Sequence, residues 1–174
     1  MIDKAIVIYW SKTGNTEKAA KAIYEALKEK NIEVDIKEVQ EAKDINYFDY
    51  DLVCIGSPTY QWSPPEEVDK FLQEKYEEFK DYIELKSPKR PNKHTLIFCT
   101  YSGPHTGKNE AIPVIKYIGQ FFEHLGFNVL DEIYILSENH GSEKASIDGK
   151  MGDIRGLPTE EDLLEVKQRV KDKI

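Results

Sequence analysis

The sequence of 174 residues contains only two cysteines, two methionines and three arginines. Two thiols are too few for a four-thiolate iron–sulfur or zinc centre within one chain. Cys54 and Cys99 both lie inside apolar runs. We therefore interpret them as buried structural thiols of a reducing compartment, and we predict no metal site.

Long apolar runs are also absent, because no stretch approaches the roughly 18 apolar residues that cross a bilayer. The chain opens on Met1–Ala5 without a basic region or a cleavage site. Its 24 basic and 32 acidic side chains give a net charge of −8, which attracts neither nucleic acid nor an anionic membrane. We expect a cytoplasmic protein with one domain over residues 1–174 that binds neither nucleic acid nor membrane.

Apolar runs typical of strands alternate with apolar patterns of helical spacing. Strands are expected over residues 4–10, 33–39, 51–56, 94–100 and 128–136, and helices over 15–31, 65–84, 108–126 and 159–174. This alternation predicts an α/β fold, with a parallel sheet covered by helices on both faces. Ligands of such sheets bind at the carboxyl ends of the strands. We therefore looked for function in the loops that follow each strand.

Three further features concern the helices. Val68, Phe71, Leu72, Tyr76, Phe79 and Ile83 recur at helical spacing within 65–84. Gly126 fits the position just past the end of the helix over 108–126. Thr159 fits an N-cap, and the acidic residues after it suit the first turn of the last helix.

The loop after the first strand carries hydroxyl side chains and a glycine directly before a helix. It comprises Ser11, Lys12, Thr13, Gly14, Asn15 and Thr16. Backbone N–H groups, hydroxyl donors and a helix N-terminus together can hold a phosphate. An ordinary capped turn is the alternative, since Ser and Thr are also common caps.

Other phosphate-binding motifs do not fit. No G-x-G-x-x-G follows the first strand. The segment Gly103–Asn109 resembles a Walker A loop, but it is one residue short between its glycines and has Asn109 where Ser or Thr must contact Mg²⁺. A phosphoacceptor domain is excluded as well, because the third strand ends in Gly56-Ser57 without an aspartate.

The loops after the third and fourth strands are uncharged and aromatic. The first, Gly56–Pro65, contains Tyr60 and Trp62, and the second, Thr100–Gly107, contains Tyr101 and His105. Together with a phosphate loop, they favour a phosphorylated, planar, polar heterocycle as ligand. Alternatively, Tyr60 and Trp62 pack beneath the following helix, and His105 lies in solvent.

At these residues the sequence resembles the flavodoxin family. Tyr9 with Ser11–Glu17 resembles that family's FMN phosphate loop, Gly56–Tyr60 resembles its second flavin loop, and Thr100–Gly103 stands where the third would. The resemblance implies a flavodoxin-like doubly wound sheet of five parallel strands in the order 2-1-3-4-5. The implied cofactor is FMN. The implied FMN-binding residues are Ser11, Lys12, Thr13, Gly14, Asn15, Thr16, Ser57, Pro58, Thr59, Tyr60, Gln61, Trp62, Thr100, Tyr101, Ser102, Gly103 and His105. We expect Trp62 and Tyr101 to contact the isoalloxazine ring, one on each side.

The resemblance favours an electron-transfer protein that acts with redox partner proteins, a reductase and an acceptor. Glu66, Glu67 and Asp69 are candidates for an acidic docking rim; alternatively, they only complement a helix N-terminus. The second hypothesis is an FMN-dependent NAD(P)H or quinone oxidoreductase, and the third is a flavin-free interaction module. We predict no catalytic residue, and the sequence leaves open whether the protein is a monomer or a homodimer.

The segment Ser137–Pro158 shows neither a helical nor an alternating pattern. A loop of this length in a compact domain usually has a function or is disordered. It leaves the same sheet edge as the flavin loops and carries several apolar residues. Our hypothesis is that it borders the flavin edge or a subunit contact; alternatively, it is a flap packed on its own domain.

Overall fold

The computed structural model describes all residues from 1 to 174. Five parallel strands form one sheet in the order β2-β1-β3-β4-β5. They are β1 (Lys4–Tyr9), β2 (Glu33–Glu38), β3 (Leu52–Pro58), β4 (His94–Tyr101) and β5 (Asn128–Leu136). The central strands are continuous apolar runs because both of their faces are covered. The predicted fold class and strand order are confirmed.

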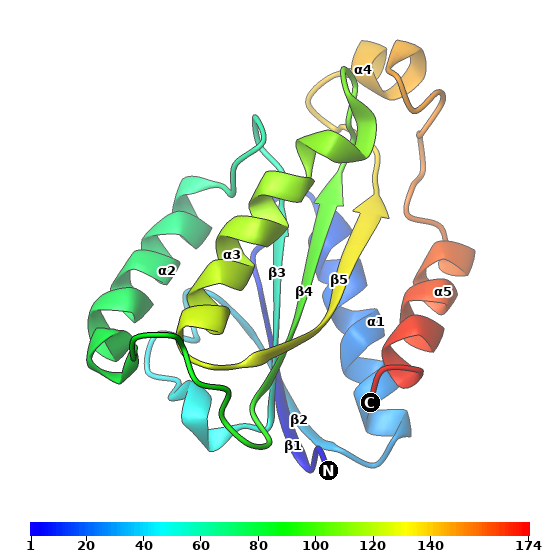
Figure 1. The fold of residues 1–174 in the computed structure, drawn as a ribbon. Helices are drawn as coiled ribbons and strands as arrows, with labels where there is room; N and C mark the ends of the chain where they lie inside the picture. Colours follow the sequence, from blue (N-terminus) through cyan, green and yellow to red (C-terminus); the bar gives the residue numbers. More distant parts are fainter.

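Helices cover both faces of the sheet. They are α1 (Asn15–Glu29), α2 (Glu66–Phe79), α3 (Ile112–His124), α4 (Glu143–Asp148) and α5 (Glu160–Lys171). In Figure 1, α1 and α5 lie on one face, α2 and α3 lie on the other, and the short α4 lies beyond the carboxyl ends of β4 and β5. None of the helices combines the length and apolar character that crossing a membrane requires.

The two core layers differ in the size of their side chains. On the face of α2 and α3 the buried cluster is aromatic and includes Tyr47, Phe79, Phe122 and Phe127. On the opposite face, α1 contributes small residues that are buried against the strands: Ala19, Ala20, Ala22 and Ala26. Large rings therefore fill one layer, and small side chains let α1 approach the sheet in the other.

The helix predicted over 65–84 is shorter, because α2 ends at Phe79 and a 3₁₀ turn, Lys80–Tyr82, follows. Tyr76, one of the residues that recur at helical spacing, has 44% of its surface exposed, whereas Lys75 is 1% exposed. The Lys75 ammonium donates to the carbonyl groups of Lys43 and Ile45, at 2.6 and 2.7 Å. Their need for a donor explains why a lysine replaces an apolar residue at this buried position.

The two ends of α3 and the start of α5 can be compared with the helix ends predicted from the sequence. A 3₁₀ turn, Gly107–Glu110, precedes α3, so the helix starts later than predicted and has Pro113 in its first turn, where a missing N–H costs nothing. Gly126 lies just past the helix end with φ +80°, as predicted. Thr159 caps α5 and forms a reciprocal pair with Asp162, also as predicted.

The segment expected to lack regular structure contains α4, so that prediction was wrong. The Ser142 side chain caps α4 by accepting the N–H of Ala145 at 3.1 Å. The helix has only six residues, too few for an apolar period to repeat.

Candidate functional site

The loop between β1 and α1 leaves several backbone donors free. Gly14 has φ +94°, a conformation that favours glycine, and its N–H donates to the Ser11 hydroxyl at 3.1 Å. The other N–H groups from residue 12 to residue 17 have no acceptor within the protein. They lie at the positive end of the α1 dipole, where an anion is stabilised.

A buried contact joins this loop to the end of β4. The hydroxyl groups of Thr16 and Thr100 lie 2.8 Å apart, and the two residues are 1% and 4% exposed. The first turn of α1 is thereby fixed against the strand that carries the third candidate loop.

A cavity of about 390 Å³ lies at the carboxyl edge of the sheet, where four loops meet. The predicted site residues that line it are Ser11, Lys12, Thr13, Asn15, Thr16, Pro58, Thr59, Tyr60, Thr100, Tyr101 and Ser102. The structure thus brings parts of all three predicted loops around one space. Its size is within the range of small-molecule sites, about 300–1,000 Å³.

The remaining predicted residues do not line the cavity. Gly14 forms the turn that precedes α1, with its positive φ. Ser57 is fully buried, and its hydroxyl donates to the Pro58 carbonyl group at 2.8 Å. Gly103 packs against the backbone of Gly107. His105 is exposed, and its backbone N–H donates to Glu110 at 2.8 Å.

Gln61 and Trp62 form the tip of a tight turn that points away from the cavity. Two hydrogen bonds of 2.9 Å between the backbones of Tyr60 and Ser63 close this turn. Trp62 has 65% of its surface exposed and lines a different surface depression. In this structure Tyr60, rather than Trp62, accompanies Tyr101 at the cavity, and the Tyr60 ring meets that of Trp10 edge-on at 6.1 Å. The contact of Trp62 with a bound ring system stays a prediction.

The cavity has a fourth wall that the residue patterns did not indicate, made by Ser137–Gly141 after β5. The Asn15 amide donates to the Glu138 carbonyl group at 3.3 Å, and the Asn139 amide donates to the Ser102 hydroxyl at 3.2 Å. The fourth wall is therefore bonded to both the first and the third loop. Its place after a strand, at the edge where ligands bind, is the signal from which we predict that this segment lies near the ligand.

The α4 region holds this wall in place. Ser146 is fully buried, and its hydroxyl accepts the Asn139 N–H at 2.9 Å and donates to the Asn139 carbonyl group at 3.2 Å. The Gly156 N–H donates to the Glu138 carboxylate at 2.8 Å. Part of the segment thus borders the cavity and is also packed on its own chain. That it borders a flavin edge or a subunit contact stays a prediction.

Few charges line the cavity. Lys12, Glu138 and His140 are the only basic or acidic residues other than tyrosine among those that line it. Burial raises the pKa of Tyr101, with a further contribution from Cys99, and burial followed by the charge of Glu67 raises the pKa of Tyr60. Burial also raises the pKa of the nearby Cys99 thiol to about 12. These groups are neutral at physiological pH, so the cavity offers uncharged donors and aromatic surfaces.

A doubly wound parallel sheet in the order 2-1-3-4-5, with a polar cavity at its carboxyl edge, defines a flavodoxin-like protein. The sequence model of the flavodoxin domain matches residues 6–126, more than half of the chain. The chain belongs to the flavodoxin family.

Two curated proteins show local similarity. A flavodoxin of Maridesulfovibrio salexigens is 36% identical over 75 residues, which are 41% of this chain and 49% of that protein. The flavodoxin-like domain-containing protein BilS of Clostridioides difficile is 47% identical over 55 residues, 30% of each. The matches thus span half or less of each relative.

Solved structures share the fold over nearly the whole chain. An archaeal flavodoxin has a TM-score of 0.65 at 23% identity, over 97% of this chain and 94% of its own. Rubredoxin oxygen:oxidoreductase of Desulfovibrio gigas has a TM-score of 0.62 at 18% identity, over 99% of this chain but 35% of its own. The same fold therefore occurs in a separate flavodoxin and as part of a larger oxidoreductase.

Proposed function

We propose that this chain binds FMN in the cavity and carries electrons between redox partner proteins. The observation that carries the proposal is the arrangement of the cavity. It has a cluster of free N–H and hydroxyl donors at the start of α1 and the rings of Tyr60 and Tyr101 among its lining residues. A phosphate and a planar heterocycle need these two kinds of surface.

The loop from Ser11 to Thr16 would hold the phosphate. Free backbone N–H groups, the hydroxyls of Ser11 and Thr13, and the α1 dipole suit a dianion. Lys12 is the only lysine or arginine at the cavity, so neutral donors would supply most of the binding. The chain shows one donor cluster of this kind and no second glycine-rich phosphate loop, which favours FMN over FAD.

The uncharged second and third loops would hold the ring system. Tyr60 and Tyr101 keep their phenol protons at neutral pH, as tyrosines do, and burial raises the pKa of each further. They can therefore donate hydrogen bonds and exclude water without adding charge. FMN, when bound, supplies one- and two-electron redox chemistry, and the protein sets its potential and its access to partners.

The test of binding is titration of the cofactor-free protein with FMN, followed by flavin fluorescence and by mass analysis of the bound cofactor. We expect stoichiometric binding with strong quenching of the fluorescence, and FMN in the mass spectrum. Absence of binding, or recovery of FAD, would contradict the proposal.

The test of electron transfer is steady-state oxidation of NADH or NADPH with a quinone as acceptor. A carrier turns over slowly until a separate flavodoxin reductase is added. Fast turnover by the FMN-loaded protein alone would identify it as an NAD(P)H or quinone oxidoreductase instead.

A further inference from the structure

The turn that follows β5 contributes a histidine to the cavity wall. His140 lines the cavity beside Glu138 and Asn139, and its backbone N–H has no acceptor within the protein. The hydrogen bonds of the fourth wall are made by Glu138, Asn139 and Gly141, and none of them involves the His140 imidazole. This turn therefore offers two donors, one from the backbone and one from the ring, that the chain itself does not use.

Asn139 holds His140 at the tip of the turn. The side-chain oxygen of Asn139 accepts the Gly141 N–H at 3.0 Å, and its carbonyl group accepts the Ser142 N–H at 3.2 Å. Asparagine commonly closes turns in this way. Asn139 is itself fixed by the buried hydroxyl of Ser146. The backbone of His140 therefore has a defined position, although its side chain is exposed.

The wall that carries His140 is attached to the loop that we propose holds the phosphate. The Asn15 amide donates to the carbonyl group of Glu138, two residues before His140. The Glu138 carboxylate, the only one among the lining residues, accepts the Gly156 N–H. The fourth wall is thus joined to the first turn of α1 by a neutral backbone group, while its acidic group is bonded to the segment after α4.

The types of residue around the cavity indicate which part of a ligand His140 would contact. Lys12 and His140 are the only lining residues whose side chains can carry a positive charge, and they follow different strands, β1 and β5. A phosphate group is stabilised by such side chains and by free N–H donors. The aromatic surface that suits a ring system comes instead from Tyr60 and Tyr101. The donors of His140 therefore match a phosphate better than a ring.

We propose that His140 is a further ligand-binding residue, which donates from its backbone N–H and its imidazole to the phosphate group of the flavin. The loop after β5 would then help the site to select a phosphorylated flavin over an unphosphorylated one. This inference rests on the proposed binding of FMN and adds a fourth loop to the three that carry the family resemblance. Because the imidazole has no partner in the chain, its removal should change ligand binding and leave folding unaffected.

The experiment compares FMN with riboflavin, which has the same ring system but no phosphate. Flavin fluorescence gives the dissociation constants of both ligands for the cofactor-free parent protein and for His140→Ala. We expect His140→Ala to weaken FMN binding about 3–10-fold, because an exposed donor to a charged group contributes less than a buried one. The affinity for riboflavin should change less than about twofold.

Two further variants separate the phosphate contact from other effects. His105→Ala is the matched control, because His105 is an exposed histidine of the third loop that does not line the cavity; both affinities should stay unchanged. His140→Lys keeps a cationic N–H donor at the turn, and its affinity for FMN should remain within about twofold of the parent. The urea midpoint of every variant should equal that of the parent, since both histidines are exposed.

Equal losses of FMN and riboflavin affinity in His140→Ala would assign His140 to the ring system and overturn the proposal. A similar loss of FMN affinity in His105→Ala, or a loss in His140→Lys as large as in His140→Ala, would overturn it as well. If the parent protein does not bind FMN, the proposed function itself is wrong. If the parent binds FMN and His140→Ala binds it equally well, only this inference is wrong.

Discussion

The side-chain hydroxyls of Thr16 and Thr100 lie 2.8 Å apart and join the first turn of α1 to the end of β4. Because both residues are buried, removing one hydroxyl leaves the other without its partner. We expect Thr16→Val or Thr100→Val to lower the free energy of unfolding by about 1–3 kcal/mol. The double variant should lose less than the sum. Urea unfolding of the cofactor-free protein measures this, and additive losses would show that the pair is not coupled.

Thr13 lies in the loop that we propose holds the FMN phosphate. We expect Thr13→Ala to weaken FMN binding by about 10–100-fold, because a hydrogen bond to a charged group contributes about 1.5–3 kcal/mol. Fluorescence titration measures the dissociation constant. Thr106→Ala is the control, since Thr106 is exposed and lies outside the cavity. An unchanged affinity in Thr13→Ala would remove Thr13 from the site.

Tyr60 and Trp62 belong to the same turn, but only Tyr60 lines the cavity. We expect Tyr60→Ala to weaken FMN binding about 3–10-fold, as loss of an aromatic contact does, and to relieve part of the fluorescence quenching. Trp62→Ala should change both quantities much less. The opposite order in a titration of the two variants would mean that the turn rearranges around the cofactor.

Ser146 connects α4 to the fourth wall of the cavity through two hydrogen bonds to the Asn139 backbone. We expect Ser146→Ala to destabilise the protein by about 1–2 kcal/mol, because the partly buried Asn139 N–H loses its acceptor. Deletion of residues 142–152 removes this anchor and should change the rate at which oxygen oxidises the reduced flavoprotein. Lys144→Ala, at an exposed position of α4, is the control. Unchanged stability in Ser146→Ala and an unchanged oxidation rate in the deletion variant would reduce the segment to a surface flap.

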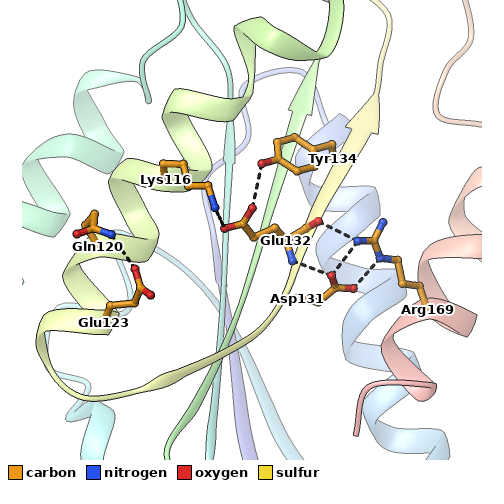
Figure 2. Close-up of polar contacts among 7 residues, drawn as sticks. All are labelled: Lys116, Gln120, Glu123, Asp131, Glu132, Tyr134 and Arg169. Carbon is orange, nitrogen blue, oxygen red and sulfur yellow. Dashed lines mark hydrogen bonds and ion pairs between the residues drawn. The ribbon is translucent and has the colours of Figure 1, made fainter. Parts of the chain in front are cut away.

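The pair Asp131–Arg169 should make stability depend on pH. Figure 2 shows Arg169 bonded to both carboxylate oxygens of Asp131 and to the Glu132 carbonyl group. Burial by itself raises the pKa of Asp131, but hydrogen bonds from Arg169 and from the Glu132 N–H outweigh it, so the pKa lies below its usual value. The stabilisation is therefore present above the unfolded-state pKa, about 4, and is lost as the pH falls through the lower pKa of the folded state.

Accordingly, Arg169→Gln should cost about 1 kcal/mol at pH 7, because the pair is bidentate but the arginine is half exposed, and the difference from the parent protein should shrink below about pH 4. Unfolding curves at several pH values measure this. Lys144→Gln, which breaks an exposed pair with Asp148, should cost less than about 1 kcal/mol. A loss in Arg169→Gln that does not vary with pH would assign its effect to packing.

The sheet and its covering helices could be predicted because local patterns determine them. The runs in β1, β3 and β4 are continuous because both faces are buried, and Gly126 and Thr159 marked helix ends by backbone and side-chain chemistry. The burial of Lys75 was not predicted, because it depends on a distant loop. The carbonyl groups of residues 43 and 45 require a donor, and no pattern within α2 records that requirement.

The cavity could be predicted only in part for a related reason. The loops after β1, β3 and β4 carry recognisable residue types, and residues predicted from all three line the cavity. The fourth wall depends on long-range contacts such as Asn15–Glu138 and Asn139–Ser102, which join residues far apart in the sequence. Aromatic composition does not reveal which of the two rings in the turn, Tyr60 or Trp62, lines the cavity.

The two core layers differ in side-chain size, so the two faces of the sheet tolerate opposite changes in side-chain volume. Ala19, Ala20 and Ala26 leave no space between α1 and the strands, so a larger side chain there would push the start of α1 away from the cavity. On the other face, around Tyr47 and Phe122, a smaller side chain would leave a void instead. As relatives diverge, the α1 face can therefore exchange residues only without gaining volume, and the α2–α3 face only without losing it.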